Sequence, residues 1–97
     1  MGVNMGVIGV GAFMSRQHLP NMKRIPGTRI HTLCDLDRDL LAERAAEYDP
    51  VRTTTDGDSV FADPEVDAVL VGTRSAEHAR FISMAAAHGK AVYVENP

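Results

Sequence analysis

The sequence predicts an α/β protein with a three-layer, doubly wound parallel sheet that helices cover on both faces. Short apolar stretches alternate with stretches rich in helix formers along the whole chain, which is the pattern of successive βαβ units. The apolar stretch Ala68–Val71 shows no polar alternation, as expected for a central parallel strand buried on both faces. Because such crossovers are right-handed, we predict the strand order 3-2-1-4-5.

The first predicted strand, Met5–Ile8, runs directly into a Gly-x-Gly turn. Gly9 lets the chain turn sharply off the strand, and Gly11, which has no Cβ, lets a pyrophosphate approach the backbone. The free amides of the following helix start, at Ala12 and Phe13, favour an anion. Met14 stands where the dinucleotide fingerprint has a third glycine. A plain tight turn therefore explains this motif equally well, and the context has to decide.

The next segment predicts a kinked helix and a second strand. Ala12 to His18 is compatible with a helix that Pro20 cannot continue, so Pro20 opens a second short turn through Ile25. Arg29 to Cys34 is mostly apolar and is predicted to be the second strand. Cys34 at its end is typical of a small buried hydrophobic residue rather than a reactive thiol.

Asp35 follows the second strand, 24 residues beyond Gly11, which is close to the ~20 expected of the acid that takes the adenine ribose hydroxyls. The alternative is a helix cap or a solvated acid, but Asp37 is better placed to cap the next helix. An acid at position 35 would repel a 2′-phosphate, so we expect NAD to bind more tightly than NADP. Arg38 could reverse this preference by pairing with that phosphate.

The rest of the chain continues the alternation of helices and strands. We predict helices over Arg38 to Tyr48, from Asp56-Gly57 to Phe61, and from a cap at Ser75 to Gly89. Their apolar stripes comprise Leu41, Ala45 and Tyr48 in the first of these helices, and Phe81, Ile82 and Ala85 in the last. Strands are predicted at Val51 to Thr54, at Ala68–Val71 and at Ala91 to Val94.

Polar residues gather where four of the predicted strands end. They are Gly9 after the first strand, Asp35 after the second, Thr73, Arg74 and Ser75 after the fourth, and Glu95 and Asn96 after the fifth. Ligands of such sheets bind beyond the carboxyl ends of the strands, where the strand order reverses. This coincidence favours a nucleotide site over a fold without a ligand.

His78, in the first turn of the last helix, has two interpretations. It is either a surface residue of that turn or a contact to the nicotinamide end of the cofactor. The four histidines show no metal-ligand spacing, and the single cysteine excludes an internal disulfide and a cysteine-rich zinc site. We therefore expect no metal.

Composition narrows the partners. A net charge of −3 provides no basic face for nucleic acid, and no apolar run approaches the ~20 residues of a membrane span. The N-terminus has no charged leader with a long apolar core. We expect a cytoplasmic protein that can form oligomers.

Taken together, these motifs resemble the N-terminal half of the glucose-fructose oxidoreductase, inositol dehydrogenase and MocA (Gfo/Idh/MocA) family. The resemblance spans nearly the whole sequence. It rests on Gly9-x-Gly11, His18-Leu19-Pro20, Cys34-Asp35-Leu36-Asp37, Ala62 to Val69, Thr73 with His78, Gly89-Lys90, and Glu95-x-Pro97. It implies a Rossmann-type domain, residues 1–97, that binds NAD or NADP. It also implies an oxidoreductase that acts on a sugar, a polyol or a related hydroxyl compound.

The sequence departs from this family at three positions. Met14 replaces a small residue, Arg74 replaces the proline after Thr73, and Asn96 replaces the lysine of the family's Glu-Lys-Pro. The family's sixth strand and second domain, which complete the substrate and catalytic site, are expected to be absent. With no catalytic residue assigned, the isolated chain is expected to be inactive. The alternative is a nucleotide-sensing regulator or partner-binding module on the same fold, which Asn96 favours.

Overall fold

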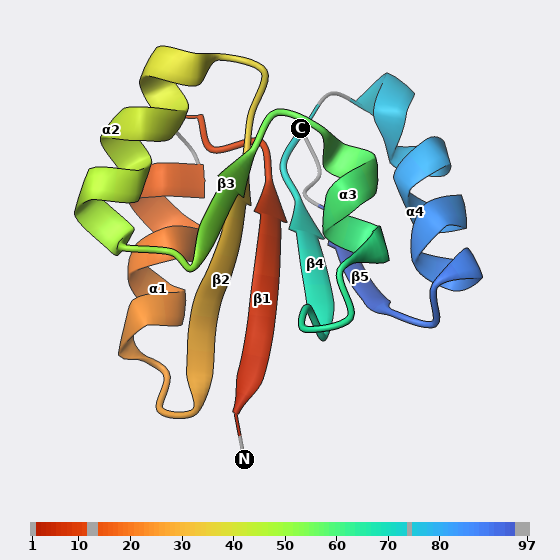
Figure 1. Ribbon diagram of the computed structural model, residues 1–97, viewed down its shortest axis with the longest axis horizontal. Coiled ribbons are helices and arrows are strands. Elements are labelled where there is room, and N and C mark those ends of the chain that lie inside the picture. The colour runs from red at the N-terminus through yellow and green to blue at the C-terminus, as the bar shows by residue number, and fades with distance from the viewer. Residues whose placement is uncertain (1, 12–13, 74, 95–97) are drawn as a thin grey trace.

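The computed structural model describes residues 2–11, 14–73 and 75–94. Within these residues, five parallel strands form one sheet in the order β3-β2-β1-β4-β5 (Figure 1). The strands are β1 (Val3–Ile8), β2 (Thr28–Cys34), β3 (Arg52–Thr54), β4 (Ala68–Val71) and β5 (Ala91–Val94). The predicted fold class and strand order are confirmed.

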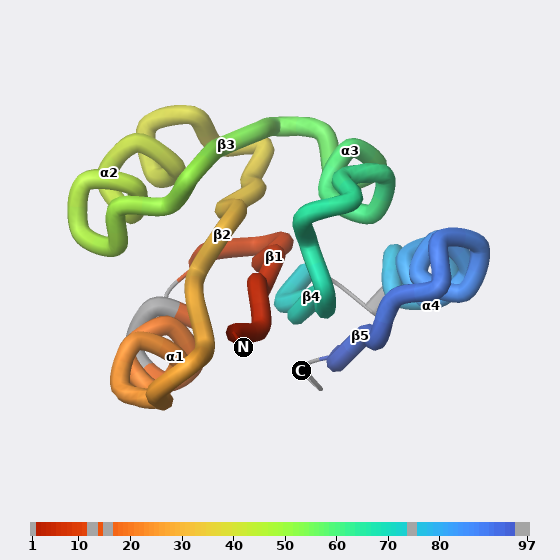
Figure 2. Tube along the Cα trace, turned by 60° about the horizontal axis from the view of Figure 1, so that its bottom comes forward, coloured from red at the N-terminus to blue at the C-terminus, as the bar shows by residue number. Residues whose placement is uncertain are grey.

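Helices cover the two faces of the sheet, as Figure 2 shows. On one face lie α1 (Leu19–Arg24) and α2 (Arg38–Tyr48), and on the other lie α3 (Gly57–Ala62) and α4 (His78–Ala87). Each face has its own apolar cluster. Leu19 and Leu41 pack with Val7 and Leu33 on the first face. On the second face, Phe61 and Phe81 stack with ring centroids 5.8 Å apart.

The segment after the glycine turn differs from the predicted helix. Met14–His18 forms a π-helical turn, and α1 begins at Leu19. Pro20 lies in the first turn of α1, where its missing N–H removes no helical hydrogen bond. Pro20 therefore opens a second helical segment, as the sequence predicts, although the first segment is wider than an α-helix.

The cap of α2 is confirmed, whereas α4 begins later than predicted. Asp37 accepts a hydrogen bond from the Leu40 N–H at 3.1 Å. At the last helix, Ser75–Glu77 forms a 3₁₀ turn (η2), and α4 starts at His78. Glu77 occupies the N-cap position of α4 without a capping hydrogen bond from its side chain.

One predicted core residue is wrong. Ile82 is 47% exposed, whereas Phe81 and Ala85 are 2% and 1% exposed. Successive helical residues point about 100° apart, so the stripe through positions 81 and 85 leaves position 82 outside the contact with the sheet. None of the helices in the described residues is long and apolar enough to cross a membrane.

Candidate functional site

The Gly-x-Gly turn crosses the carboxyl ends of the central strands. The Gly9 N–H donates to the Cys34 carbonyl at 2.8 Å, and the Gly72 N–H donates to the Ile8 carbonyl at 2.7 Å. Gly9 has a φ of 88°, and a Cβ there would lie 2.9 Å from the Gly72 carbonyl carbon. Glycine at position 9 is thus needed by the fold itself, because the first turn and the end of β4 approach so closely.

Gly11 differs from Gly9 because the chain does not need glycine there. A Cβ at position 11 would meet no described atom within 4 Å, and the residue lies on the wall of a cavity. The space beside Gly11 is therefore open to a ligand.

Asp35 points from the end of β2 toward this turn. Its Oδ2 accepts the Val10 N–H and its Oδ1 accepts the Asp37 N–H, both at 2.9 Å. Asp37 rather than Asp35 caps α2. A carboxylate has about four acceptor positions, so each Asp35 oxygen has capacity for a further donor. The helix-cap alternative for Asp35 is thereby excluded, and its role toward a ligand stays a prediction.

The turn and Asp35 border a cavity of about 690 Å³ at the carboxyl ends of the strands. Its wall continues from Gly9 and Gly11 through Asp35 and Leu36 to the starts of α3 and α4. Arg38 is not among the residues that line this cavity. It borders an adjoining cavity of about 420 Å³ with Leu41 and Thr53, and Thr55 lines both cavities. The structure thus brings Asp35 to the main cavity and leaves Arg38 outside it.

Thr73 and His78 lie at the other side of the cavity, after β4. Thr73 borders the cavity, and its buried Oγ1 has no hydrogen-bond partner among the residues that the structure describes. The His78 Nε2 lies 2.9 Å from the Thr73 carbonyl oxygen. A carbonyl only accepts, so Nε2 carries the proton and donates it to Thr73. His78 ties α4 to the Thr73 turn and is not among the residues that border the cavity.

Cys34 borders the cavity but is only 3% exposed. Burial, followed by the negative charges of Asp35 and Asp56, raises the pKa of its thiol to about 12. The thiol therefore stays protonated at neutral pH and is no nucleophile. The prediction of a buried hydrophobic residue is confirmed.

The other predicted contacts, Ala12, Phe13, Arg74, Glu95 and Asn96, lie outside the described residues. Among the residues that are described, no group of three or more His, Cys, Asp or Glu side chains could hold a metal ion.

The matching family model is that of an oxidoreductase family with an NAD-binding Rossmann fold, Gfo/Idh/MocA, and it covers residues 3–97. The chain belongs to this family.

Inositol 2-dehydrogenase of Burkholderia multivorans is one relative within the Gfo/Idh/MocA family. It is 33% identical over 99 residues, which cover 100% of this chain and 29% of the relative. The chain thus spans less than a third of the length of the curated relatives it matches.

Two solved structures share the fold over 100% of this chain. An oxidoreductase from Agrobacterium radiobacter in complex with NAD⁺, L-tartaric acid and magnesium has a TM-score of 0.91 at 27% identity, and the match covers 28% of it. KijD10, a 3-ketoreductase from Actinomadura kijaniata in complex with NADP and TDP-benzene, has a TM-score of 0.90 at 25% identity, and 30% of it is covered. The family thus includes structures with either nucleotide.

The site of this Gfo/Idh/MocA chain fits a dinucleotide. The space beside Gly11 is open, the Asp35 carboxylate has acceptor positions beyond its two backbone hydrogen bonds, and the buried Thr73 hydroxyl lacks a partner in the described part of the chain. The described residues thus leave space beside Gly11 unfilled and hydrogen-bonding positions of Asp35 and Thr73 unoccupied.

Sequence reasoning missed two parts of the site. Gly72 is one, since a Cβ there would lie 2.6 Å from the Met14 Cε. A glycine directly after a buried strand is a sequence signal for such close packing. Met14, which stands where the fingerprint has a small residue, is 3% exposed, and its methyl group lies in the gap beside Gly72. The second part is the contact between Asp58 and Arg80, which join α3 and α4 at the outer wall. No pattern marks a pair so far apart in sequence.

Proposed function

We propose that this chain holds NAD for an oxidoreductase that acts on a hydroxyl group of a sugar, a polyol or a related compound. The observation that carries the proposal is Gly11, a glycine that the local fold does not require, beside open space in the turn after β1. Relatives named as inositol 2-dehydrogenases support the substrate class.

The proposed roles follow the order of the strands. Gly9 and Gly11, with the amides of Ala12 and Phe13, would hold the pyrophosphate, and Asp35 would accept the adenine ribose hydroxyls. Thr73 would donate its hydroxyl to the bound nucleotide. Arg74 and Asn96, from their places at strand ends, and Glu95, by the family resemblance, would complete the contacts. His78, which does not line the cavity, would act through the Thr73 turn that it holds. When bound, NAD supplies the hydride acceptor.

The orientation of Asp35 supports a preference for NAD over NADP. Its carboxylate points toward the glycine turn, whereas Arg38 does not line the main cavity and borders only the one that adjoins it at Thr55. A phosphate near this carboxylate is repelled by ~1 kcal/mol or more at a separation of a few ångströms. Equal or tighter binding of NADP in calorimetric titrations would contradict the role of Asp35.

Gly11→Val tests the binding site directly. The added side chain enters open space and should leave the free energy of unfolding within ~0.5 kcal/mol of the wild type. The binding of NAD in calorimetry should be lost, because the side chain occupies the space meant for the phosphates. Ala46→Val, on the exposed side of α2, is the control for an added Val side chain. If Gly11→Val binds NAD as the wild type does, the proposed site is wrong.

We also propose that the isolated chain transfers no hydride. Oxidation of a hydroxyl needs a positioned base to take its proton, and by the resemblance the lysine of Glu-Lys-Pro takes part in this step. Asn96 cannot titrate, and the Cys34 thiol in the cavity wall keeps its proton because its pKa is about 12. Nicotinamide absorbance assays against sugars and polyols should show no turnover for this chain. Turnover by the unmodified chain would contradict the proposal.

Asn96 favours a second candidate function, a nucleotide-sensing regulator without chemistry. Any longer natural form that carries Asn96 separates the two proposals. Turnover by that form favours the oxidoreductase and places the base in the added part. Binding of NAD with no turnover, before and after Asn96→Lys, favours the regulator.

A further inference from the structure

Arg80 lies at the outer wall of the cavity, held by two contacts on the protein side. Its guanidinium donates to the Asp58 carboxylate at the start of α3. Its Cζ also lies over the Phe81 ring, 4.4 Å from the centroid. The side chain is still 53% exposed. A planar cation is therefore held in place while much of its surface remains open.

Leu36 belongs to the same wall and is 83% exposed. It directly follows Asp35, whose carboxylate is bonded to the glycine turn. An isolated exposed leucine is ordinary on a protein surface. Here, however, the leucine shares a cavity with a fixed guanidinium.

The order of the residues along the cavity wall indicates which part of a bound dinucleotide would lie beside each of them. The glycine turn follows β1, Asp35 and Leu36 follow β2, and Asp58 follows β3, so the wall runs outward across neighbouring strands. A dinucleotide with its phosphates at the turn and a ribose on Asp35 extends its base past Asp35. The base then reaches the part of the cavity that Leu36 and Arg80 border.

We infer that the guanidinium of Arg80 is a stacking surface for the adenine base, with Leu36 as the apolar contact beside it. The inference rests on the proposed function, because it assumes a dinucleotide in this cavity. Asp58 already pairs with the charge of Arg80, which leaves the planar face as its available contact. Guanidinium planes stack well on aromatic rings, and adenine presents such a ring.

The test measures the binding of ADP-ribose and of nicotinamide mononucleotide by calorimetry. Arg80→Ala should weaken ADP-ribose and NAD about tenfold, in the range of a cation–π contact, and leave nicotinamide mononucleotide unchanged. Arg80→Lys should weaken ADP-ribose several-fold, because it keeps the charge and loses the plane. Arg24→Ala, at the exposed end of α1, is the matched control and should change neither ligand.

Varying the salt concentration distinguishes stacking of Arg80 on the base from attraction between its charge and the phosphates. The tenfold difference between the wild type and Arg80→Ala should persist between 50 mM and 500 mM salt, whereas a charge effect is screened. Leu36→Ser, at a residue too exposed to affect folding, should also weaken ADP-ribose several-fold.

The outcomes distinguish the inference from the proposed function. If the wild type binds neither NAD nor ADP-ribose, the proposed function fails and the inference fails with it. If the wild type binds both and Arg80→Ala binds ADP-ribose equally well, only the inference is overturned. It is also overturned if both half-ligands weaken alike, or if the difference disappears at high salt.

Discussion

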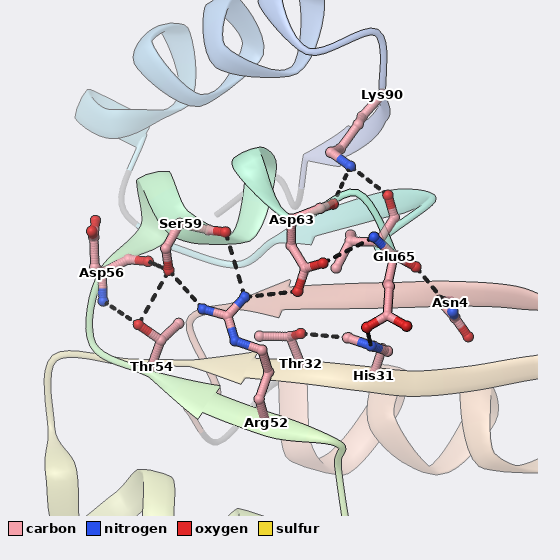
Figure 3. Close-up of polar contacts among 11 residues, drawn as sticks. Asn4, His31, Thr32, Arg52, Thr54, Asp56, Ser59, Asp63, Glu65 and Lys90 are labelled. Atoms are coloured by element: carbon pink, nitrogen blue, oxygen red, sulfur yellow. Dashed lines mark hydrogen bonds and ion pairs between the residues drawn. The ribbon is translucent and has the colours of Figure 1, made fainter.

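The two ends of the sheet differ in how completely the described residues pair their buried polar side chains. At the amino ends of the strands, side chains and carbonyls satisfy one another within the chain (Figure 3). At the carboxyl ends, a cavity of about 690 Å³ lies beside Gly11 and the buried Thr73 hydroxyl, which has no partner in the described residues. The contacts at the amino ends, here called the closed end, stabilise the fold. The carboxyl ends, here called the open end, retain space and hydrogen-bonding capacity for a ligand.

The closed end is built around the turn from Asp63 to Asp67. Arg52 donates to the Asp63 carboxylate at 2.8 Å, and the Asp63 carboxylate also accepts the Glu65 N–H at 2.9 Å. Asn4 and Asp67 exchange hydrogen bonds of 2.7 and 2.8 Å. These contacts join β1 and β3 to the turn before β4, at the end of the sheet opposite the cavity.

The role of a buried polar residue can be inferred from whether its hydrogen bonds are complete. Such groups normally have partners, and within the described residues every buried side-chain N or O atom at the amino ends has one, so the unpaired Thr73 hydroxyl at the other end is informative. Substitutions at the two ends should therefore separate stability from binding.

The largest expected effect is that of Gly9→Ala. An L-residue at a φ of 88° is strained, and its Cβ would lie 2.9 Å from the Gly72 carbonyl carbon. We expect the free energy of unfolding to fall by about 3 kcal/mol, measured by urea denaturation. Gly11→Ala is the control and should stay within ~0.5 kcal/mol of the wild type. Similar losses for both variants would remove the distinction between the two glycines.

Asp63→Asn tests the closed end through its pH dependence. Mainly the Glu65 N–H, and then Arg52, hold the pKa of the Asp63 carboxyl below its usual range despite the opposing effect of burial. The carboxylate therefore contributes its full share to the free energy of unfolding at any pH above its pKa in the unfolded chain. This share is lost as the pH falls through its lower pKa in the folded chain. Asp63→Asn should lower the free energy of unfolding by about 1–3 kcal/mol at pH 7, with NAD binding unchanged.

The difference between the wild type and Asp63→Asn should narrow in urea titrations as the pH falls from the ordinary carboxyl pKa, about 4, toward the lower folded pKa, because the unfolded chain takes up the proton first. Asp39→Asn, at an exposed carboxylate in the first turn of α2, should show little effect at either pH. A difference that stays constant from pH 7 to pH 3 would mean that the charge of Asp63 is not what stabilises the turn.

Lys90→Met should have a smaller effect at the same end. The Lys90 Nζ donates to the carbonyls of Asp63 and Val66 at 2.6 and 2.5 Å. Methionine keeps the aliphatic length but leaves both carbonyls without this donor, so we expect a loss of about 1–2 kcal/mol in urea denaturation. Lys23→Met is the control at about 0.5 kcal/mol, because the wild-type ammonium lies 5.8 Å from the centre of the ring of the half-buried Tyr48. Equal effects would contradict the role of the two carbonyls.

The open end was more predictable from the sequence than the closed end. Gly9, Asp35 and Thr73 follow strands whose apolar pattern is local, so the parallel topology alone brings them to one edge. The closed end depends on pairs such as Arg52 with Asp63 and Lys90 with Val66, which lie far apart along the chain. No periodicity encodes such contacts.

Details of packing were also beyond the sequence. The apolar character of Ile82 predicts that its side chain is buried. Whether a side chain of α4 is buried depends, however, on the width of the contact between α4 and the sheet, and Ile82 lies outside that contact and is exposed. Met14 replaces a small residue, yet the glycine at position 72 leaves room beside its methyl group. The pattern of residue types along one element predicts which of its faces is buried and where it lies in the chain. How closely two elements pack depends on the side chains of both elements together.

Thr73→Val has the smallest expected effect on the free energy of unfolding. It should also separate stability from NAD affinity most clearly. The substitution replaces the buried hydroxyl by a methyl group of similar size. Because Oγ1 has no partner in the described residues, removing it relieves an unpaired polar group. The free energy of unfolding should stay unchanged or rise by up to about 1 kcal/mol. NAD should nevertheless bind several-fold more weakly in calorimetry, because the variant loses a donor to the nucleotide.

Thr73→Ser is the matched control for this prediction, since it keeps the hydroxyl and loses only the methyl group. It should lower the stability slightly and keep most of the affinity for NAD. The opposite result, a Thr73→Val variant that is destabilised by more than 1 kcal/mol and binds NAD as the wild type does, would assign the hydroxyl to the fold. The two ends of the sheet would then no longer differ in how completely their polar groups are paired, and the cavity alone would distinguish them.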